Sequence, residues 1–370
     1  MNTIEDYCDL LEFRYIGKSK SFYEGYKYAF KRLEKYNYIM DIQNNSLDIK
    51  PSVMEKDFGD VSISSIIKNF QALLFILEVE KYNDKTINYF KEYFKTICDR
   101  QNQAAEDQEM SEKEMENWID YLDLFERFKQ YYEYEVKDKE ISYDKLRGIT
   151  LIGLFVCIPP ARLGNYTDMK FKFRKKLEGR QLQRCYNYLF CDRSDCEDYN
   201  YKEFKLIHNN YKTCNVLGQV IYDLYPSFNY YEYLTRPVYQ EGSVIIADLL
   251  EKYLDKRLLI QKTWSGINRR VCNDYLFTTE KGSFMTTQNM NYMLNTSSNH
   301  IFGKELSCNM FRHIFMTHYL KQNMDIKSNR QVALLMGQTY NPTMMEKYVR
   351  SPRPAKPKKK TKEKISVNFD

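Results

Sequence analysis

Hydrophobic residues recur at helical spacing in three segments near the start of the chain. Aromatic and basic residues are mixed at this spacing over 22–37. Serine residues that can cap a helix begin the segment 62–78, where isoleucine, phenylalanine and leucine fall at i, i+3, i+4 and i+7. The segment 83–98 is also amphipathic, with Asn83 or Asp84 as its cap. These segments predict one small helical domain.

A polar break separates this region from the remainder of the chain. Residues 106–126 contain nine acidic side chains and one basic side chain, Lys113, as is typical of a solvated linker and helix face. We therefore place a domain boundary here. The expected organisation is a helical domain over 1–106, a second domain over 107–350 and a basic tail over 351–370.

The second region mixes helices with short strands. Two helices are predicted first, at 117–134 and 143–158. Short alternating segments bounded by turn residues then occupy 168–222, as in an antiparallel sheet. Helical periodicity resumes over 243–256, 286–296, 307–322, 328–337 and 342–349. The predicted fold class is mainly α with a small antiparallel sheet, an α+β arrangement.

Composition narrows the class of protein. The 370 residues include no run of eighteen apolar residues and no apolar signal segment at the start, so we expect no membrane contact and no secretion. The nine cysteines lack a framework spacing, which indicates reduced thiols inside a cell. Cys185, Cys191 and Cys196 contain no CxxC pair of the kind that binds zinc. The net charge is +6, concentrated in 351–370, and favours an anionic partner.

Four separated segments carry polar groups suited to one phosphodiester. They contain Arg162 after a proline pair, Lys212 after an Asn-Asn turn, Arg312 within a helix and Tyr348 near the end of the last predicted helix. The forked donors of arginine match phosphate oxygens, and a tyrosine hydroxyl can serve as a nucleophile. The pattern therefore predicts chemistry on a phosphate ester.

The helix predicted over 307–322 has two distinct faces. Its apolar face includes His318, which we interpret as a packed histidine. Asn309 and Arg312 lie three residues apart, so they would share the opposite, exposed face. His313 diverges from Arg312 by about 100° and is expected to have a supporting role.

The segment before Tyr348 contains clear helix boundaries. Gly337 is placed to end one helix as its C-cap. Asn341 followed by Pro342 is typical of the start of the next helix, which would carry Tyr348. Tyr340 is a rival hydroxyl, but it lies very close to Gly337 in sequence.

The order of these motifs resembles that of the tyrosine recombinase, or phage integrase, family. Within the family, the chain is most similar to integrases of virophages and related large DNA viruses or mobile elements. The motifs are IPPARLGNY, NYKT, YLFTTEKG, FGKELSCNMFRH and MGQ, followed by Tyr348, and they span roughly residues 117–350. The segment SISSIIKNFQALLFIL at 62–77 is more distantly similar to the family's helical core-binding domain.

The resemblance implies a role for each matched residue. Tyr348 would attack the scissile phosphate and form a 3′-phosphotyrosyl link, and Arg162 and Arg312 would clamp the non-bridging oxygens. Lys212 would protonate the departing 5′ oxygen. No metal, nucleotide or other cofactor is expected, because cationic side chains supply the positive charge.

Two further positions depart from the family pattern. Asn309 stands where the family often has histidine, and Gln338 where it often has histidine or tryptophan. Both can donate amide hydrogen bonds to a phosphate. The family also commonly has an acid shortly after the first arginine, where this chain has Gly164 and Asn165.

The resemblance therefore implies a site-specific DNA recombinase or integrase. Its partner would be double-stranded DNA, and its working form a homotetramer on two DNA sites. It would act inside the cell wherever the target DNA lies, in a host nucleus or a viral factory. Two alternatives remain: a type IB topoisomerase-like enzyme, and a DNA-binding relative with weak or lost cleavage.

Overall fold

The structure is a computed structural model that describes residues 2–59, 61–106, 110–173, 183, 185–192, 203–211, 214–224, 237–267, 274–279, 282–322, 325–338, 340–341 and 348–350. The chain divides into two compact units, Met1–Asp107 and Gln108–Asp370. Each unit has its own hydrophobic core. We describe them separately.

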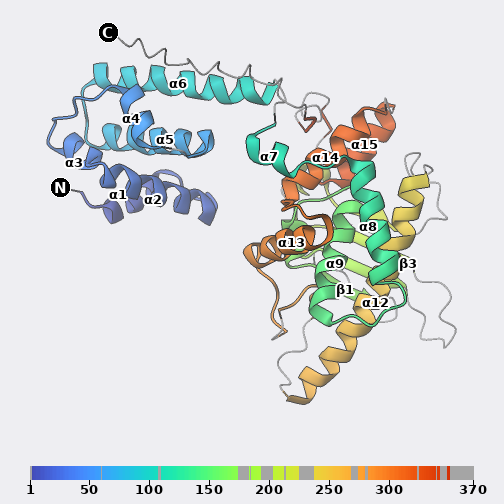
Figure 1. The fold of residues 1–370 in the computed structure, drawn as a ribbon. Coiled ribbons are helices and arrows are strands. Elements are labelled where there is room, and N and C mark those ends of the chain that lie inside the picture. Colours follow the sequence, from blue (N-terminus) through green and yellow to red (C-terminus); the bar gives the residue numbers. More distant parts are fainter. Residues whose placement is uncertain are drawn as a thin grey trace, which may run out of the picture. The chain divides into compact units, whose positions relative to one another are not determined.

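The first unit is helical. Its helices are α1 (Ile4–Arg14), α2 (Lys20–Lys35), α3 (Tyr38–Gln43), α4 (Pro51–Asp57), α5 (Ile63–Val79) and α6 (Asp84–Glu106) (Figure 1). The helices predicted over 22–37, 62–78 and 83–98 are confirmed as α2, α5 and α6.

Helix α5 forms the centre of this unit. Ser62 caps it, since the serine side chain accepts a hydrogen bond from the backbone N–H of Ser65. The helix packs against both α2 and α6. Its Phe70 and Phe75 rings are buried, and Phe75 contacts Phe30 of α2 at a centroid distance of 6.1 Å. The apolar spacing of the sequence therefore corresponds to a helix enclosed by its neighbours.

The second unit contains most of the helices. They are α7 (Glu112–Asn117), α8 (Tyr121–Glu135), α9 (Tyr143–Val156), α10 (Gly164–Thr167), α11 (Cys214–Leu217), α12 (Pro237–Ile267), α13 (Thr287–Phe302), α14 (Cys308–Leu320) and α15 (Ile326–Leu335). Helix α9 is the centre, because every residue from Leu146 to Val156 is buried. It contacts α8, α12, α13 and α14, which surround it.

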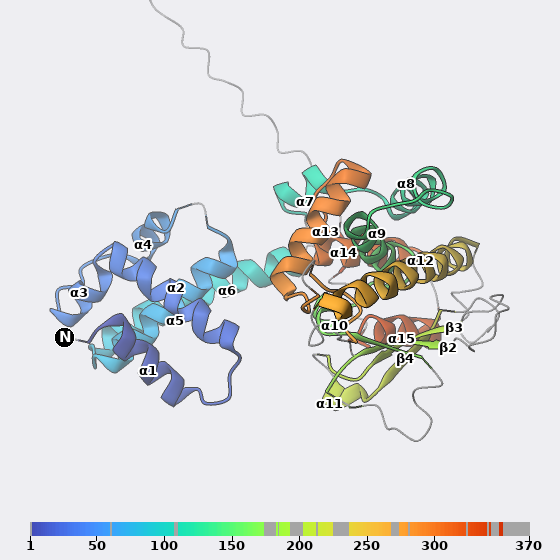
Figure 2. The same ribbon diagram turned by 90° about the horizontal axis from the view of Figure 1, so that it is seen from below.

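The sheet of this unit has four strands in the order β1-β2-β3-β4. They are β1 (Lys170–Phe173), β2 (Tyr188–Asp192), β3 (Glu203–His208) and β4 (Val220–Asp223). Helix α15 lies beside the sheet and contacts β4 (Figure 2).

The prediction of an antiparallel sheet is only partly right, since the sheet is mixed. Strand β1 pairs with β2 in parallel, and the other two pairings are antiparallel. A parallel pair needs a connection of roughly a dozen residues or more, and the chain from 174 to 187 provides one. Strand patterning gives no direction of pairing, so the sequence did not reveal this.

Helix α14 joins the core to the segments that follow it. Phe311 is buried against Phe155 of α9 at 5.5 Å, as its apolar spacing predicted. The prediction of an exposed opposite face is wrong for Arg312, which is buried, as is Met316 one turn further along α14. Met336, Gln338 and Tyr348 cover Arg312, and each accepts a hydrogen bond from it.

Some predictions fall on residues outside the described part. They are the region 342–347 of the last predicted helix, the tail 351–370 and Cys196; residues 348–350 are described and are not helical. Cys185 is exposed and Cys191 is buried in β2.

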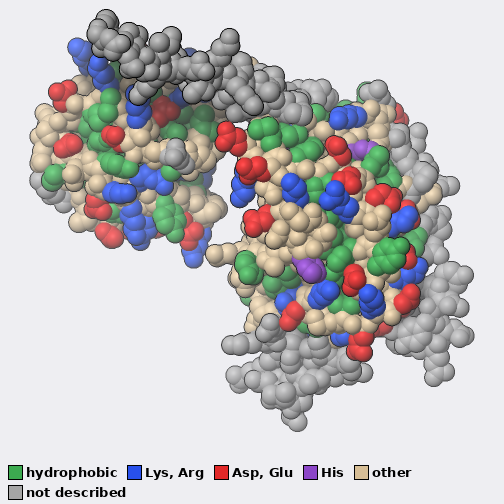
Figure 3. Space-filling model, in the orientation of Figure 1, with side chains coloured by type: hydrophobic (Ala, Val, Ile, Leu, Met, Phe, Trp, Pro, Cys, Tyr) green, Lys and Arg blue, Asp and Glu red, His purple; other side chains and the backbone are tan. Residues whose placement is uncertain are grey.

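Charged side chains of both signs are interspersed over the visible face of the second unit (Figure 3). Among the described residues, no helix is long and apolar enough to cross a membrane, and no group of three or more His, Cys, Asp or Glu side chains could hold a metal ion.

Candidate active site

Three of the four phosphate-binding candidates meet in the second unit, although they are far apart in the sequence. Arg162 follows α9, Arg312 lies on α14 and Tyr348 follows the turn that ends α15. Gln338, in that turn, joins the same cluster. We call these four residues the arginine–tyrosine cluster.

Arg312 is the most deeply buried cation of the cluster, with 1% of the residue exposed. Its Nη1 donates to the carbonyl oxygens of Pro160 at 2.7 Å and Met336 at 3.0 Å. Its Nη2 donates to Oε1 of Gln338 and to the hydroxyl of Tyr348, both at 3.2 Å. These partners are neutral oxygens, so they fix the guanidinium without cancelling its charge.

Arg162 supplies a second cation beside the first. Its Nη1 donates to the carbonyl oxygen of Gly337 at 2.6 Å. Burial, and then the neighbouring charge of Arg312, lower the pKa of Arg162, whereas the Tyr348 hydroxyl acts in the opposite direction. Two positive charges are thus held close together at the tyrosine, an arrangement that favours an anion between them.

The turn after α15 presents carbonyl oxygens to both arginines. Gly337 has a left-handed φ of +66°, and the N–H of Gln338 donates to the carbonyl oxygen of Ala333 at 3.0 Å. The predicted C-cap is therefore confirmed, as a Schellman motif. This turn points the carbonyl of Met336 at Arg312 and that of Gly337 at Arg162.

Tyr348 is half-buried, and its ring lies over the guanidinium of Arg312 with 5.2 Å between Cζ and the ring centroid. The rival Tyr340 occupies another environment, because its ring lies 5.8 Å from Cζ of Arg330. The two tyrosines therefore differ in their surroundings. Among the contacts of the described residues, Tyr348 contacts Arg312 and Tyr340 does not.

Three supporting residues were not predicted from the sequence as part of a site. Arg350 contacts both His313 and Glu114, and Asn187 organises a turn described next. Glu114 lies in the acidic segment that we interpreted as a linker, and nothing in its sequence neighbourhood indicates a partner 236 positions away.

Lys212 lies outside the described residues, but the chain leading to it is fixed. The buried Asn187 accepts hydrogen bonds from the N–H groups of Asn209 and Asn210 at 2.8 Å each, and donates to the carbonyl oxygen of Asn165 at 2.9 Å. A Cβ at Gly337 would meet the Tyr211 ring at 3.4 Å. The residue before Lys212 therefore packs directly against the turn that carries Gln338.

Asn309 is not brought into the cluster. It lies in the first turn of α14 and is exposed, whereas Arg312 of the same helix is buried. Helical spacing places Asn309 and Arg312 at neighbouring positions on α14. It does not reveal that another segment covers Arg312 and leaves Asn309 exposed. A role for Asn309 stays a prediction.

His318 and His313 occupy the environments expected for packed or supporting residues. His318 stacks on Tyr121 at a centroid distance of 4.8 Å. Burial, and then the charge of Arg350, lower the pKa of His313 to about 4. His313 is therefore neutral at neutral pH and adds no third charge to the cluster.

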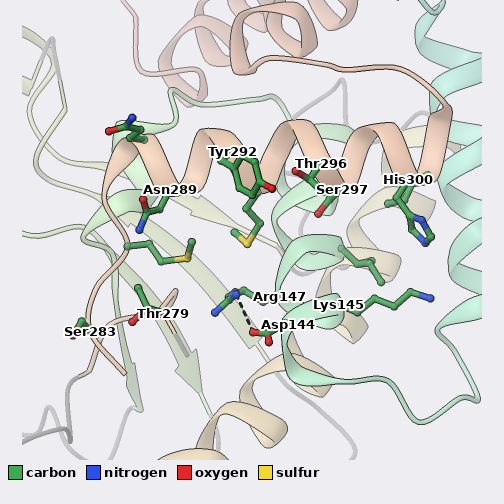
Figure 4. Close-up of a pocket in the computed structure, with 15 residues that line it drawn as sticks. Asp144, Lys145, Arg147, Thr279, Ser283, Asn289, Tyr292, Thr296, Ser297 and His300 are labelled. Atoms are coloured by element: carbon green, nitrogen blue, oxygen red, sulfur yellow. Dashed lines mark ion pairs between the residues drawn. The ribbon is translucent and has the colours of Figure 1, made fainter. Parts of the chain in front are cut away.

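A cavity lies elsewhere in the second unit, beside α13. It has a volume of about 1190 Å³ and is lined by α13, by the start of α9 and by residues around 279–285 (Figure 4). Its Arg147 pairs with Asp144 at 2.9 Å and donates to the carbonyl oxygen of Thr278. None of the four residues of the arginine–tyrosine cluster lines this cavity.

Comparisons with known proteins give the following. No model of a known protein family matches the sequence, and no curated protein matches it. The fold is similar to that of XerA recombinase, with 13% identity, a TM-score of 0.33 and coverage of 94% of this chain and 93% of that one. It is also similar to XerH site-specific recombinase bound to palindromic difH substrate in a post-cleavage complex, with 14% identity, a TM-score of 0.44 and coverage of 93% and 79%.

Proposed function

We propose that the protein is a site-specific recombinase that cuts and rejoins duplex DNA through a covalent link to Tyr348. The observation that carries this proposal is the contact of 3.2 Å between the Tyr348 hydroxyl and Nη2 of the buried Arg312. A hydroxyl beside two uncompensated cations suits attack on an anionic phosphodiester. The ordered motifs of the sequence support the same chemistry.

The proposed reaction assigns a task to each residue. The Tyr348 oxygen bonds to phosphorus and loses its proton, and the bond between phosphorus and the 5′ oxygen breaks. The departing 5′ oxygen gains one proton, so the number of protons is unchanged. Arg162 and Arg312 stabilise the charge that develops on the non-bridging oxygens. Lys212 is the proposed acid that protonates the 5′ oxygen.

Gln338 has a defined part in this scheme. Its Oε1 accepts a hydrogen bond from Arg312, which fixes the orientation of the amide. The other end of the amide carries N–H groups that can donate to a phosphate oxygen. Gln338 would then both orient the arginine and bind the substrate.

The wider assignment is part of the same proposal. The helical unit 1–106 would bind DNA as a core-binding domain, and 107–350 would catalyse. A homotetramer would assemble on two DNA sites, because strand exchange joins ends from two duplexes. We place the protein nearest the integrases of virophages and related large DNA viruses or mobile elements, acting inside the cell where the target DNA lies.

A nicked suicide substrate tests the covalent step. The full-length protein should become attached to the 3′ end of the cut strand, and the attachment should persist in EDTA and without ATP. Tyr348→Phe should abolish it while DNA binding stays within about twofold. Tyr340→Phe is the matched control, and it should form adduct at the normal rate. Adduct formation by the Tyr348→Phe protein would show that the nucleophile is another residue.

A DNA-binding relative without cleavage is the second candidate. The exposed position of Asn309 favours it, because the cluster then holds one amide donor fewer than the sequence predicts. Tight binding of DNA with no trapped adduct, under conditions where the site is fully occupied, would establish this candidate instead.

A further inference from the structure

The backbone around Tyr348 is held by Arg350, two residues further along the chain. The N–H of Arg350 donates to Oγ1 of Thr317 on α14 at 3.0 Å. Its guanidinium reaches two other groups: Nη2 contacts Nε2 of His313 at 3.1 Å, and Nε lies 3.5 Å from Oε1 of Glu114. The Arg350 side chain is only 16% exposed. The contacts therefore lie largely out of water, where ion pairs are least screened.

The donor and acceptor roles at His313 follow from these contacts. An arginine side chain can only donate, so Nε2 of His313 must accept. The ring proton of the neutral imidazole is then on Nδ1, which lies 2.9 Å from the carbonyl oxygen of Tyr348 and donates to it. The Tyr348 and His313 rings also touch, with centroids 5.3 Å apart. A continuous chain of hydrogen bonds thus runs from Arg350 through His313 to the backbone of Tyr348.

Glu114 anchors the other end of this chain. Ser111 donates to Oε2 of Glu114 from both its N–H and its hydroxyl at 2.9 Å, which leaves Oε1 facing Arg350. Helix α7 is itself fixed to the segment between α13 and α14, because the N–H of Glu305 donates to Oδ1 of Asn117 at 3.0 Å. The carboxylate is therefore a rigidly placed charge rather than a mobile surface group.

We propose that Arg350 is a positioning residue for the nucleophile, acting through Glu114 and His313 to keep the Tyr348 hydroxyl at Arg312. This inference rests on the proposed function. Tyr348 lies in a turn rather than in a helix, and the contacts of Arg350 hold this segment against α14. A displacement of about 1 Å at a reacting group can cost about 10²-fold in rate, so such a restraint has a measurable effect.

Substitutions of Arg350 and of Glu114 test the positioning role. Arg350→Met should slow adduct formation on the suicide substrate by about 10- to 100-fold, within the cost of misplacing a reacting group. Arg350→Lys should recover part of the rate, because a lysine can still pair with Glu114. Glu114→Gln should slow the reaction less, and the double variant should be no slower than Arg350→Met alone, since both act through one chain.

A matched control and two further measurements exclude a loss of folding or binding. Arg127→Met removes an exposed ion pair with Asp123 on α8 and should leave the adduct rate unchanged. DNA affinity at fixed salt and the melting temperature should change little in Arg350→Lys and Glu114→Gln. An adduct rate that falls only as the melting temperature or affinity falls would overturn the positioning role.

A small external nucleophile shows whether Arg350 positions the tyrosine or acts on the phosphate. In a Tyr348→Phe background, hydrogen peroxide can attack the same phosphate without the tyrosine. Arg350→Met should leave this peroxide-promoted cleavage unchanged, whereas Arg312→Ala should suppress it. Equal suppression by Arg350→Met would overturn the inference, since Arg350 would then act on the phosphate.

The remaining outcomes distinguish this inference from the proposed function. An active unsubstituted protein with a normal rate in Arg350→Met would overturn the positioning role alone. Failure of the unsubstituted protein to form any adduct would overturn the proposed function and this role together.

Discussion

Two buried arginines of the second unit have different partners, and the difference separates the proposed reactive site from a structural one. Arg312 is 1% exposed and Arg147 is 9% exposed, and both donate to backbone carbonyl oxygens. Arg147 also pairs with the carboxylate of Asp144, while Arg312 contacts an amide and a tyrosine hydroxyl. Only Arg312 keeps an uncompensated charge for an incoming anion.

We expect the reaction at the arginine–tyrosine cluster rather than at the cavity beside α13. Arg147 lines that cavity, and its charge is already neutralised by Asp144. The arginine–tyrosine cluster instead orients two cations at one hydroxyl. Charges that are already oriented toward the reacting group need no reorganisation, and they are usually the largest single source of transition-state stabilisation.

The largest expected effect comes from removing each arginine in turn. Arg312→Ala should reduce single-turnover cleavage by about 10²- to 10³-fold, the scale for loss of a transition-state donor. Arg312→Lys should also be strongly impaired, since a lysine lacks the fork that serves several oxygens at once. Arg147→Met should instead leave the rate at saturating DNA unchanged and lower stability by about 1–3 kcal/mol. The comparison fails if Arg147→Met slows the chemical step as much as Arg312→Ala does.

The next effect concerns the general acid. Lys212→Ala should slow cleavage by about 10²-fold, within the usual range for general acid catalysis. A substrate with a 5′-thio leaving group should restore most of the rate, because sulfur leaves with little protonation. Arg312→Ala is the control that this substrate should not rescue. Lack of rescue in an otherwise inactive Lys212→Ala protein would exclude the general-acid role.

The two amides should differ, although the sequence gives them similar parts. Gln338→Ala removes the acceptor for Arg312 and should slow cleavage by about 10- to 10³-fold. Gln338→His should keep or increase the rate, since imidazole can also donate. Asn309→Ala, at an exposed position, should change the rate by less than about threefold. Equal losses in the two alanine variants, by single-turnover cleavage, would place Asn309 at the phosphate after all.

Local patterns predicted most helices and the segments of the site, but not what covers them. The periodicity around Arg312 shows two faces, and the covering turn at Gly337 comes from another part of the chain. Asn187 and Glu114 were missed for the same reason, because their roles depend on partners brought near only by folding. The parallel pairing of β1 with β2 likewise depends on a long connection rather than on strand composition.

The smallest expected effect is a pH dependence of stability that arises because burial disfavours the charged form of two histidines. The pKa of His313 is lowered to about 4 by burial and then by Arg350, and burial lowers the pKa of His208 to about 4 as well. The ordinary pKa of a histidine side chain is 6.5. Between these values the unfolded chain binds more protons than the folded one, so stability falls as pH is lowered from about 6.5 to 4.

This last prediction can be divided between the two residues. His313→Gln and His208→Gln should each flatten the dependence by removing up to about one proton from the difference between the unfolded and folded states. Urea unfolding at pH 7, 6, 5 and 4 measures the slope, and His300→Gln is the control, since His300 lies at the cavity beside α13. Burial raises the pKa of Glu114, but the Ser111 hydrogen bonds and the Arg350 charge outweigh it, so the pKa is lowered. Such carboxylates also make stability fall as the pH is lowered toward 4. The histidine contribution is therefore tested most directly between pH 6.5 and 5, where an unchanged slope in both variants would show that neither ring is held neutral by the fold.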